Sequence, residues 1–380
     1  MKTERGLLVR ERNCLERYLP GLREKLERTP FLEREKPRGP GIGLFRDAGG
    51  AALLVPRRYH GKGASALDAV RVQRAVGALS PSLAVASTMH HFSTAALVEL
   101  AAGSGMEWLL LQAIAQSDLL LASGFAEGQP GQHVLRPTMT ARRVPGGLRV
   151  SGAKKPCSLT WSMDLLSASA RVVDGGGEGS DLAVLVVPAK SEGIARREFW
   201  GNWVLAGAES DEIRLDDVFV PDRLVIYPED PDISRDPVHA KGFVWFEMLI
   251  SATYLGMASG LAERVLLSGR APSADIARLG VELEGAMHAL EGLALAFDSD
   301  SDGSEVDLAG ALFVRYAVQQ TVERAAMAAA ALAGGMAFIG SSEVSYLLAA
   351  CRALTYHPPS FGTMADALAG YLAGAELTLL

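Results

Sequence analysis

The side chains best suited to acid–base chemistry lie in the C-terminal part of the chain. Glu247 is followed by Ser251 and Tyr254 at spacings of four and seven, so an α-helix would place all three on one face. A carboxylate buried beside an apolar pocket has a raised pKa and can act as a general base near neutral pH. The alternative is that Glu247 faces solvent on an amphipathic helix. His357 is a second candidate because imidazole titrates near neutrality, but the two prolines that follow it favour a structural or substrate-contact role equally.

A strand followed by a turn could present a hydroxyl group to a ligand. Leu148 and Val150 alternate with polar residues, which predicts a half-buried strand, and Gly152 then allows the backbone to bend. Ser158 closes this segment. A serine at the end of a strand is more often structural than functional, so the segment needs support from other motifs.

Composition limits the classes of function. The chain has 380 residues, of which 49% are hydrophobic and 21% charged, as expected for a globular protein of two or three domains. A net charge of -7 argues against a nucleic-acid partner. Cys14, Cys157 and Cys351 are too far apart for a zinc motif and suggest no disulfide framework. The charged N-terminus and the lack of a long uninterrupted apolar run predict a cytoplasmic protein without a membrane partner. No metal site is expected.

Hydrophobic periodicity divides the chain into three parts. Residues 1–118 show helical patterns, including Leu7–Glu27 and Ser65–Leu79, with a proline-rich loop expected at Thr29–Gly43. Residues 119–230 show short strand-like runs, and residues 231–380 are helical again. The alanine-rich run within this last part has small side chains that suit a tightly packed bundle or an oligomer interface.

Several motifs, in the same order along the chain, resemble the acyl-CoA dehydrogenase family. Glu127 and Gly131 match the family's T-E-P-x-A-G-S-D loop. The family's G-x-K-x-W-I-T motif is matched by Gly152, Lys154 and Ser158, although its tryptophan is absent. The most specific match is the segment from Ala208 to Pro221, which resembles the strand S-x-T-x-x-L-x-F-E-D-V-x-V-P.

The resemblance implies an α+β fold with three domains. These are an N-terminal helical domain (1–118), a central β-barrel-like domain (119–230) and a C-terminal four-helix bundle (231–380). It implies FAD as cofactor, with FMN or free reduced flavin as alternatives, and a homodimer or homotetramer. The residues implied to hold the flavin are Phe125, Ala126, Glu127, Gly128, Pro156, Cys157, Ser158, Arg270, Gly334 and Gly335.

The function that the resemblance implies is α,β-dehydrogenation of an acyl thioester carried by CoA or an acyl carrier protein. Glu247 falls within one residue of the base used by one branch of the family, and His357 is kept as a further catalytic candidate. The residues expected to contact substrate are His91, Gln132, Tyr254 and Tyr356.

Two other functions stay open. Flavin-dependent monooxygenases share the fold, bind reduced flavin, react with oxygen and need a dry pocket more than a proton acceptor. The loss of several family residues, among them the phenylalanine and glycine expected after Arg270, also allows a non-catalytic relative that no longer binds flavin.

Overall fold

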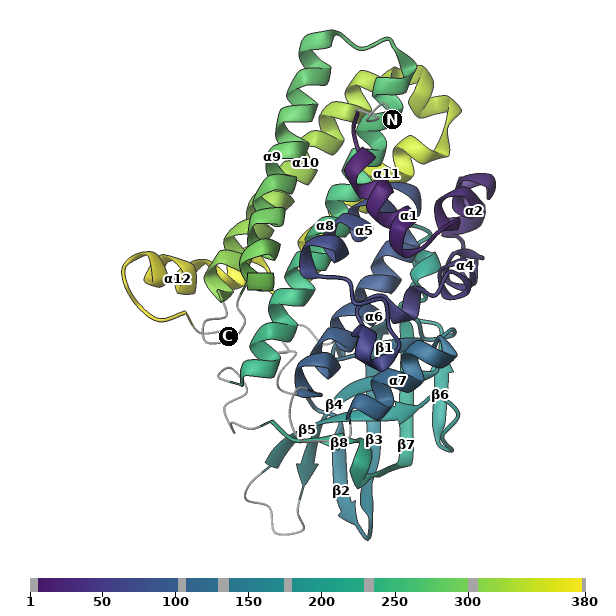
Figure 1. Cartoon of the computed structure of the whole chain (residues 1–380), viewed down its shortest axis with the longest axis vertical. Helices are drawn as coiled ribbons and strands as arrows, with labels where there is room; N and C mark the ends of the chain where they lie inside the picture. Colours follow the sequence, from purple (N-terminus) through teal and green to yellow (C-terminus); the bar gives the residue numbers. More distant parts are fainter. Residues whose placement is uncertain are drawn as a thin grey trace.

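The structure is a computed structural model that describes residues 6–101, 107–128, 137–173, 180–228, 236–299 and 307–377. Long helices run along the major axis of the molecule, and a β-sheet forms one end (Figure 1). The fold is the α+β arrangement of acyl-CoA dehydrogenases predicted from the motifs. The N-terminal helices are α1 (Val9–Tyr18), α2 (Leu22–Arg28), α3 (Phe31–Glu35), α4 (Gly41–Asp47), α5 (Ala66–Leu79), α6 (Pro81–Leu100) and α7 (Glu107–Ser117).

The prolines of the N-terminal part begin helices where the sequence suggested loops. Pro30 and Pro40 are the N-cap residues of α3 and α4; α3 lies inside the expected loop and α4 begins inside it. Pro81 occupies the first turn of α6, where a backbone N–H has no partner within the helix and none is lost. The helix is therefore continuous through His90 and His91. The helix predicted over Leu7–Glu27 divides into α1 and α2, because Gly21 has a left-handed backbone with φ 76°.

The central part forms one eight-stranded sheet. Its strands are β1 (Leu121–Gly124), β2 (Thr140–Val144), β3 (Gly147–Cys157), β4 (Leu165–Val173), β5 (Ser180–Pro188), β6 (Ile194–Arg197), β7 (Asp211–Pro221) and β8 (Val225–Ile226). The order is β6-β7-β3-β2-β4-β5-β8, with β1 parallel to β4. The two most informative motifs lie on β3 and β7, which pair antiparallel, with Lys154 opposite Ile213. Segments about 60 residues apart in the sequence are therefore neighbours in the sheet.

The C-terminal helices are organised around α8 (Pro237–Ser268), which packs against α5, α6, α9 (Ser273–Ser299), α10 (Leu308–Gly340) and α11 (Ser342–Arg352). A short 3₁₀ helix, η6 (Ala353–Tyr356), and α12 (Phe361–Leu372) follow. Glycine allows α5 and α8 to approach closely, since a Cβ on Gly256 would lie 2.2 Å from the carbonyl oxygen of Arg74. α8 is therefore the shared wall between the N-terminal and C-terminal helices.

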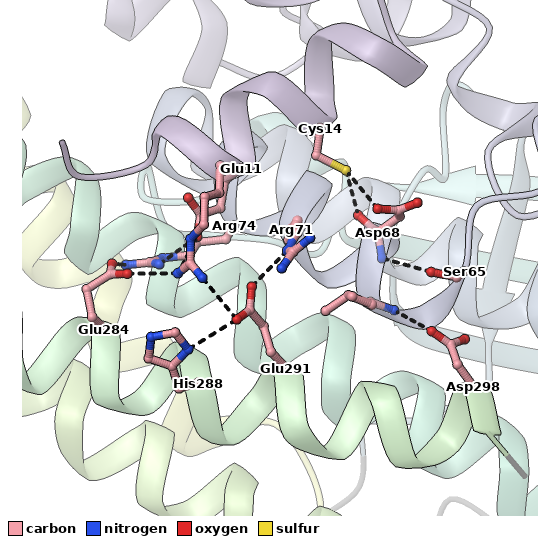
Figure 2. Close-up of polar contacts among 12 residues, drawn as sticks. Glu11, Cys14, Ser65, Asp68, Arg71, Arg74, Glu284, His288, Glu291 and Asp298 are labelled. Atoms are coloured by element: carbon pink, nitrogen blue, oxygen red, sulfur yellow. Dashed lines mark hydrogen bonds and ion pairs between the residues drawn. The ribbon is translucent and has the colours of Figure 1, made fainter. Parts of the chain in front are cut away.

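A cluster of ion pairs ties the N-terminal helices to α9 (Figure 2). Arg74 of α5 is fully buried and donates to Glu11 of α1 at 2.8 Å and to Glu284 of α9 at 2.7 Å. The carboxylate of Asp298, at the end of α9, accepts the first two backbone N–H groups of α5. Since a helix N-terminus favours negative charge, this contact anchors α5 at its start.

Among the described residues, α10 is the one helix whose length and composition would allow it to span a bilayer. Only 22% of its most apolar window is buried within the single chain. Met327, Met336 and Ile339 are 64%, 78% and 79% exposed. An apolar helix with this exposure also has the properties of a protein–protein interface.

Candidate active site

The two segments predicted to hold the flavin lie side by side. The backbone N–H of Lys155 on β3 donates to the carbonyl of Ala126, just after β1, at 2.8 Å. Within the described part of the chain, the backbone N–H groups of Ala126 and Gly128 donate to no acceptor. Pro156 is exposed beside them, at the position of the family's tryptophan. Free donors next to an exposed ring suit the edge and face of a planar heterocycle.

Ser158 forms a hydroxyl pair with Ser210, which begins the segment leading into β7. Their Oγ atoms are 2.9 Å apart, and the two residues are 7% and 5% exposed. The turn before Ser210 is joined to the segment after Ser158 by two backbone hydrogen bonds: Leu159 N–H donates to Ala208, and Thr160 N–H to Glu209. The hydroxyl pair is thus fixed from both strands.

Glu127 fixes the conformation of the segment after β1, Phe125–Gly128, which we call the flavin loop. Its carboxylate is buried and lies 2.7 Å from Nζ of Lys154, which is fully buried. The same carboxylate accepts the backbone N–H groups of Thr138 and Met139. Cys157 is also buried, and burial raises the pKa of its thiol, so it contributes backbone and packing to the site. With the free N–H donors and the Ser158 hydroxyl, these residues fit a flavin ring.

A row of aromatic side chains continues from the flavin loop into the helices. The ring of Phe125 is 6.4 Å from that of Phe92 on α6, which is 5.4 Å from Phe246 on α8. The Phe246 ring is 6.2 Å from the imidazole of His357, which follows η6. The hydroxyl of Tyr254 lies 2.9 Å from Nε2 of His357. This aromatic row, Phe125, Phe92, Phe246, His357 and Tyr254, forms an apolar wall that ends in one polar pair.

The polar pair is neutral at pH 7. Burial, and secondarily the charge of Arg315, lower the pKa of the His357 imidazole to about 3. Burial raises the pKa of the Tyr254 phenol well above its usual range. The two groups therefore share a hydrogen bond without placing a charge in the apolar wall.

Glu247 lies on the same face of α8 as Ser251 and Tyr254, as the helical spacing predicts, but its carboxyl group is paired. Its Oε2 lies 3.1 Å from Nε of Arg315 on α10, and both side chains are withdrawn from solvent. Desolvation raises the pKa of Glu247 to about 8, although Arg315 acts in the opposite direction. The solvent-facing alternative is excluded by this burial. The carboxylate instead belongs to the interior between α8 and α10.

The other predicted cofactor residues lie far from the flavin loop within one chain. Arg270 is exposed just after α8, which rises roughly 30 Å from Glu247 to its end at ~1.5 Å per residue. Gly334 marks a kink near the end of α10, with φ 81°, and Gly335 beside it is exposed. The ends of α8 and α10 lie away from the sheet (Figure 1). A flavin contact by these residues would have to come from a second copy of the chain.

The predicted substrate residues are also distributed. Tyr254 belongs to the aromatic row, whereas Tyr356 is 76% exposed. His91 is fully buried, and its ring contacts are with Phe45 and His90. Gln132 lies outside the described residues. The substrate roles of His91, Gln132 and Tyr356 stay predictions.

Three residues of the site were not among the sequence-based candidates. Ser210 occupies a hydroxyl position in the β7 motif, so comparison of the motifs could have identified it. Phe92 and Phe246 had no such signal, because aromatic residues at helical spacing are usually core residues. Their place in the site follows from the packing of α6 against α8 and against the segment after β1.

The fold and this site define a flavoenzyme with the acyl-CoA dehydrogenase fold. No protein-family model matches the chain. It is 45% identical over 374 residues to isobutylamine N-hydroxylase of Streptomyces viridifaciens, covering 97% of this chain and 98% of the relative. The chain belongs to the family of isobutylamine N-hydroxylase, and it is a flavin-dependent oxidoreductase.

More distant relatives agree with this assignment. Dibenzothiophene monooxygenase of Rhodococcus qingshengii is 26% identical over 247 residues, covering 63% of this chain and 58% of the relative. KijD3, solved with FMN and a dTDP-linked sugar, superposes with a TM-score of 0.82 at 19% identity, covering 96% and 94% of the two chains. XiaF from Streptomyces sp., solved with FADH2, has a TM-score of 0.78 at 17% identity, covering 98% and 97%. These findings confirm the predicted fold and the expectation of a flavin, whether FAD, FMN or free reduced flavin.

Proposed function

We propose that the protein is a monooxygenase that N-hydroxylates a small primary aliphatic amine. The structural observation that carries the proposal is the pairing of Glu247 with Arg315, which occupies the carboxyl group predicted to be the base. The similarity to isobutylamine N-hydroxylase supports an amine as substrate. The monooxygenase alternative is therefore preferred to dehydrogenation of an acyl thioester.

The proposed reaction balances without a further reactant. A primary amine, molecular oxygen and the reduced flavin give a hydroxylamine, water and the oxidised flavin. The reduced flavin, when bound, supplies both electrons and activates the oxygen. One oxygen atom forms the new N–O bond and the other leaves as water.

The residues of the chain would hold the flavin and keep the reaction dry. The Ser158 and Ser210 hydroxyls and the free N–H groups of Ala126 and Gly128 would bind the polar edge of the ring. The aromatic row would exclude water from the face where oxygen reacts, which suppresses side reactions.

The neutral pair of Tyr254 and His357 would orient the amine. An aliphatic amine is an ammonium ion in water, and its nitrogen can form a bond to oxygen only after losing a proton. An apolar wall disfavours the charged form, so binding beside Phe246 lowers the pKa of the amine. When its Nε2–H donates to the Tyr254 oxygen, the neutral imidazole has Nδ1 free to accept a hydrogen bond from the amine, which would orient the nitrogen lone pair.

Dehydrogenation would require a different arrangement. A base that removes an α-proton must reach the substrate beside the flavin, and Glu247 lies against Arg315 instead. Loss of flavin binding is disfavoured by the intact hydroxyl pair and the free N–H donors of the flavin loop. The cytoplasmic location and the absence of nucleic-acid and membrane partners stay predictions.

A two-part experiment separates these functions. The full-length protein is mixed anaerobically with oxidised FAD or FMN and a panel of acyl-CoA and acyl-carrier thioesters, and the flavin absorbance is followed. In parallel, photoreduced flavin, oxygen and isobutylamine are supplied, and hydroxylamine is quantified by mass spectrometry. The proposal expects hydroxylamine and no bleaching by thioesters. Stoichiometric bleaching without hydroxylamine would restore the dehydrogenase hypothesis, and failure to bind flavin in either form would support the non-catalytic one.

A further inference from the structure

A buried polar cluster lies where the three parts of the chain meet. The hydroxyl of Tyr346, on α11, donates to Oε2 of Glu35 on α3 at 2.7 Å and accepts the backbone N–H of Leu205 at 2.8 Å. It also lies 3.2 Å from Oγ of Ser82 in the first turn of α6. Tyr346 is fully buried. One hydroxyl group thus joins the C-terminal bundle, the N-terminal helices and the segment that precedes β7.

Leu205 begins the turn that supports the flavin-facing hydroxyl pair. The turn continues through the 3₁₀ helix η3 (Ala206–Ala208) to Ser210, whose Oγ is 2.9 Å from that of Ser158. Ala208 accepts the N–H of Leu159 at 3.0 Å, in the segment that follows Ser158. A displacement of Leu205 would therefore move both sides of the hydroxyl pair.

Packing against α3 and α6 also holds the Leu205–Ser210 turn in place. A Cβ on Gly207 would lie 3.0 Å from the carbonyl oxygen of Glu35 and 3.0 Å from Cβ of Ser82, so the turn presses directly on α3 and α6. The ring of Trp203 packs edge-on against Tyr346, with centroids 5.1 Å apart. The Tyr346 hydroxyl is a polar contact within this apolar packing, and its loss would leave three buried groups, on Glu35, Ser82 and Leu205, with one partner fewer each.

We propose that Tyr346 is a positioning residue for flavin binding, acting through the Leu205–Ser210 turn on the Ser158 and Ser210 hydroxyls. Through this contact the C-terminal bundle sets the shape of a cofactor site built on the sheet. The inference depends on the flavin site and is independent of the substrate, so a flavin-binding assay without amine or oxygen tests it separately from the proposed function.

The experiment is a double-mutant cycle on the full-length protein, with the dissociation constants of oxidised FMN and FAD measured by fluorescence titration. Tyr346→Phe keeps the ring and removes the hydroxyl, and it should weaken flavin binding roughly tenfold. In a background that carries both Ser158→Ala and Ser210→Ala, the same change should have less than about a twofold effect, because the hydroxyl groups that it positions are absent. Equal losses in the two backgrounds, or unchanged binding in the single variant, would overturn the proposal.

A matched control separates positioning from general stability. The hydroxyl of Tyr18 donates to Asp68 at 2.7 Å, the same length as the bond from Tyr346 to Glu35, in a cluster of the N-terminal helices. Tyr18→Phe should leave the flavin dissociation constant unchanged; a loss equal to that of Tyr346→Phe would count against positioning.

A second variant covers the case in which Tyr346→Phe does not fold. Gly207→Ala forces the turn away from Glu35 and leaves Tyr346 intact. It should weaken flavin binding in the wild-type background and have little effect in the background that carries both Ser158→Ala and Ser210→Ala. Unchanged flavin binding in this folded variant would contradict the role of the turn.

Discussion

Oε2 of Glu247 lies 3.1 Å from Nε of Arg315, and this contact is enclosed between α8 and α10. Arg315 is further held by the carbonyl of Leu354, to which its Nη2 donates at 2.7 Å. The carboxyl group that the sequence predicts as the base is thereby held against a buried arginine. A site whose predicted base is paired in this way, beside an apolar wall, suits oxygen transfer to an amine better than removal of an α-proton.

Separating this pair should destabilise the protein. Glu247→Leu would leave the Arg315 guanidinium buried without the carboxyl group that it contacts, with an expected loss of about 3–5 kcal/mol in the free energy of unfolding. The double variant Glu247→Leu with Arg315→Met should recover most of that loss, since an apolar pair of similar volume often replaces a buried ion pair without cost. Urea denaturation of the three proteins measures these differences. A single variant as stable as the wild type would show that the pair is not buried.

The free energy of unfolding should depend on pH through the protonation of Glu247. Its folded pKa is raised to about 8, above that of the unfolded chain, so the native state retains a proton that the unfolded chain releases. This contribution is complete below the unfolded pKa of about 4.3 and is lost as the pH rises towards the folded value. The stability of the wild type relative to Glu247→Gln should therefore fall between pH 5 and pH 8. Thermal unfolding at several pH values checks this, and a constant or rising difference would contradict the raised pKa.

His357 should govern how efficiently reduced flavin is used. His357→Phe preserves an aromatic surface and removes the hydrogen bond to Tyr254, so flavin binding should persist. Product formed per reduced flavin should fall by at least about tenfold, with hydrogen peroxide rising in compensation, because the amine is no longer oriented. Tyr254→Phe should have a similar effect. Simultaneous assays of hydroxylamine and peroxide test both variants, and full coupling in both would remove the polar pair from the mechanism.

Among the ion pairs of Figure 2, the most buried one should contribute most to the free energy of unfolding. Arg74→Met removes the nearest charged partner of Glu11, which is 1% exposed, and should cost about 3–5 kcal/mol in the free energy of unfolding. Arg278 offers a matched control: it pairs with Asp275 at 2.8 Å, but its side chain is 77% exposed. Arg278→Met should change stability by less than about 0.5 kcal/mol. Equal losses in the two variants would show that burial does not set the strength of these contacts.

We also propose that the protein associates with itself through α10. Met336 and Ile339 are 78% and 79% exposed in the single chain, and Arg270 and Gly334 could reach a flavin only from a second copy. Sedimentation velocity at micromolar concentration should show a dimer or tetramer. Ile339→Asp should shift it towards monomer, whereas Leu32→Asp, on α3, should not. A monomeric wild-type protein would refute this assembly.

Most helices and strands could be predicted from the sequence, because apolar residues recur with a different spacing on the buried face of a helix than on that of a strand. The β3 and β7 motifs were located within a residue or two, and the predicted helix at Ser65–Leu79 corresponds to α5. The pairing of Glu247 with Arg315 could not be predicted, because α8 is surrounded by five helices and no face of it is simply polar. The bond between Tyr254 and His357 joins residues 103 positions apart. Contacts of this kind depend on how whole helices pack, which a single sequence does not show.

Transfer of an oxygen atom to an amine nitrogen tests the central claim most directly. The purified protein, photoreduced FMN or FAD and isobutylamine would be mixed under ¹⁸O₂, and the products analysed by mass spectrometry. The account predicts a hydroxylamine that carries one ¹⁸O atom, with the second atom recovered in water. An absence of labelled hydroxylamine from isobutylamine and other small primary amines, while anaerobic acyl thioesters reduce the bound flavin, would contradict it.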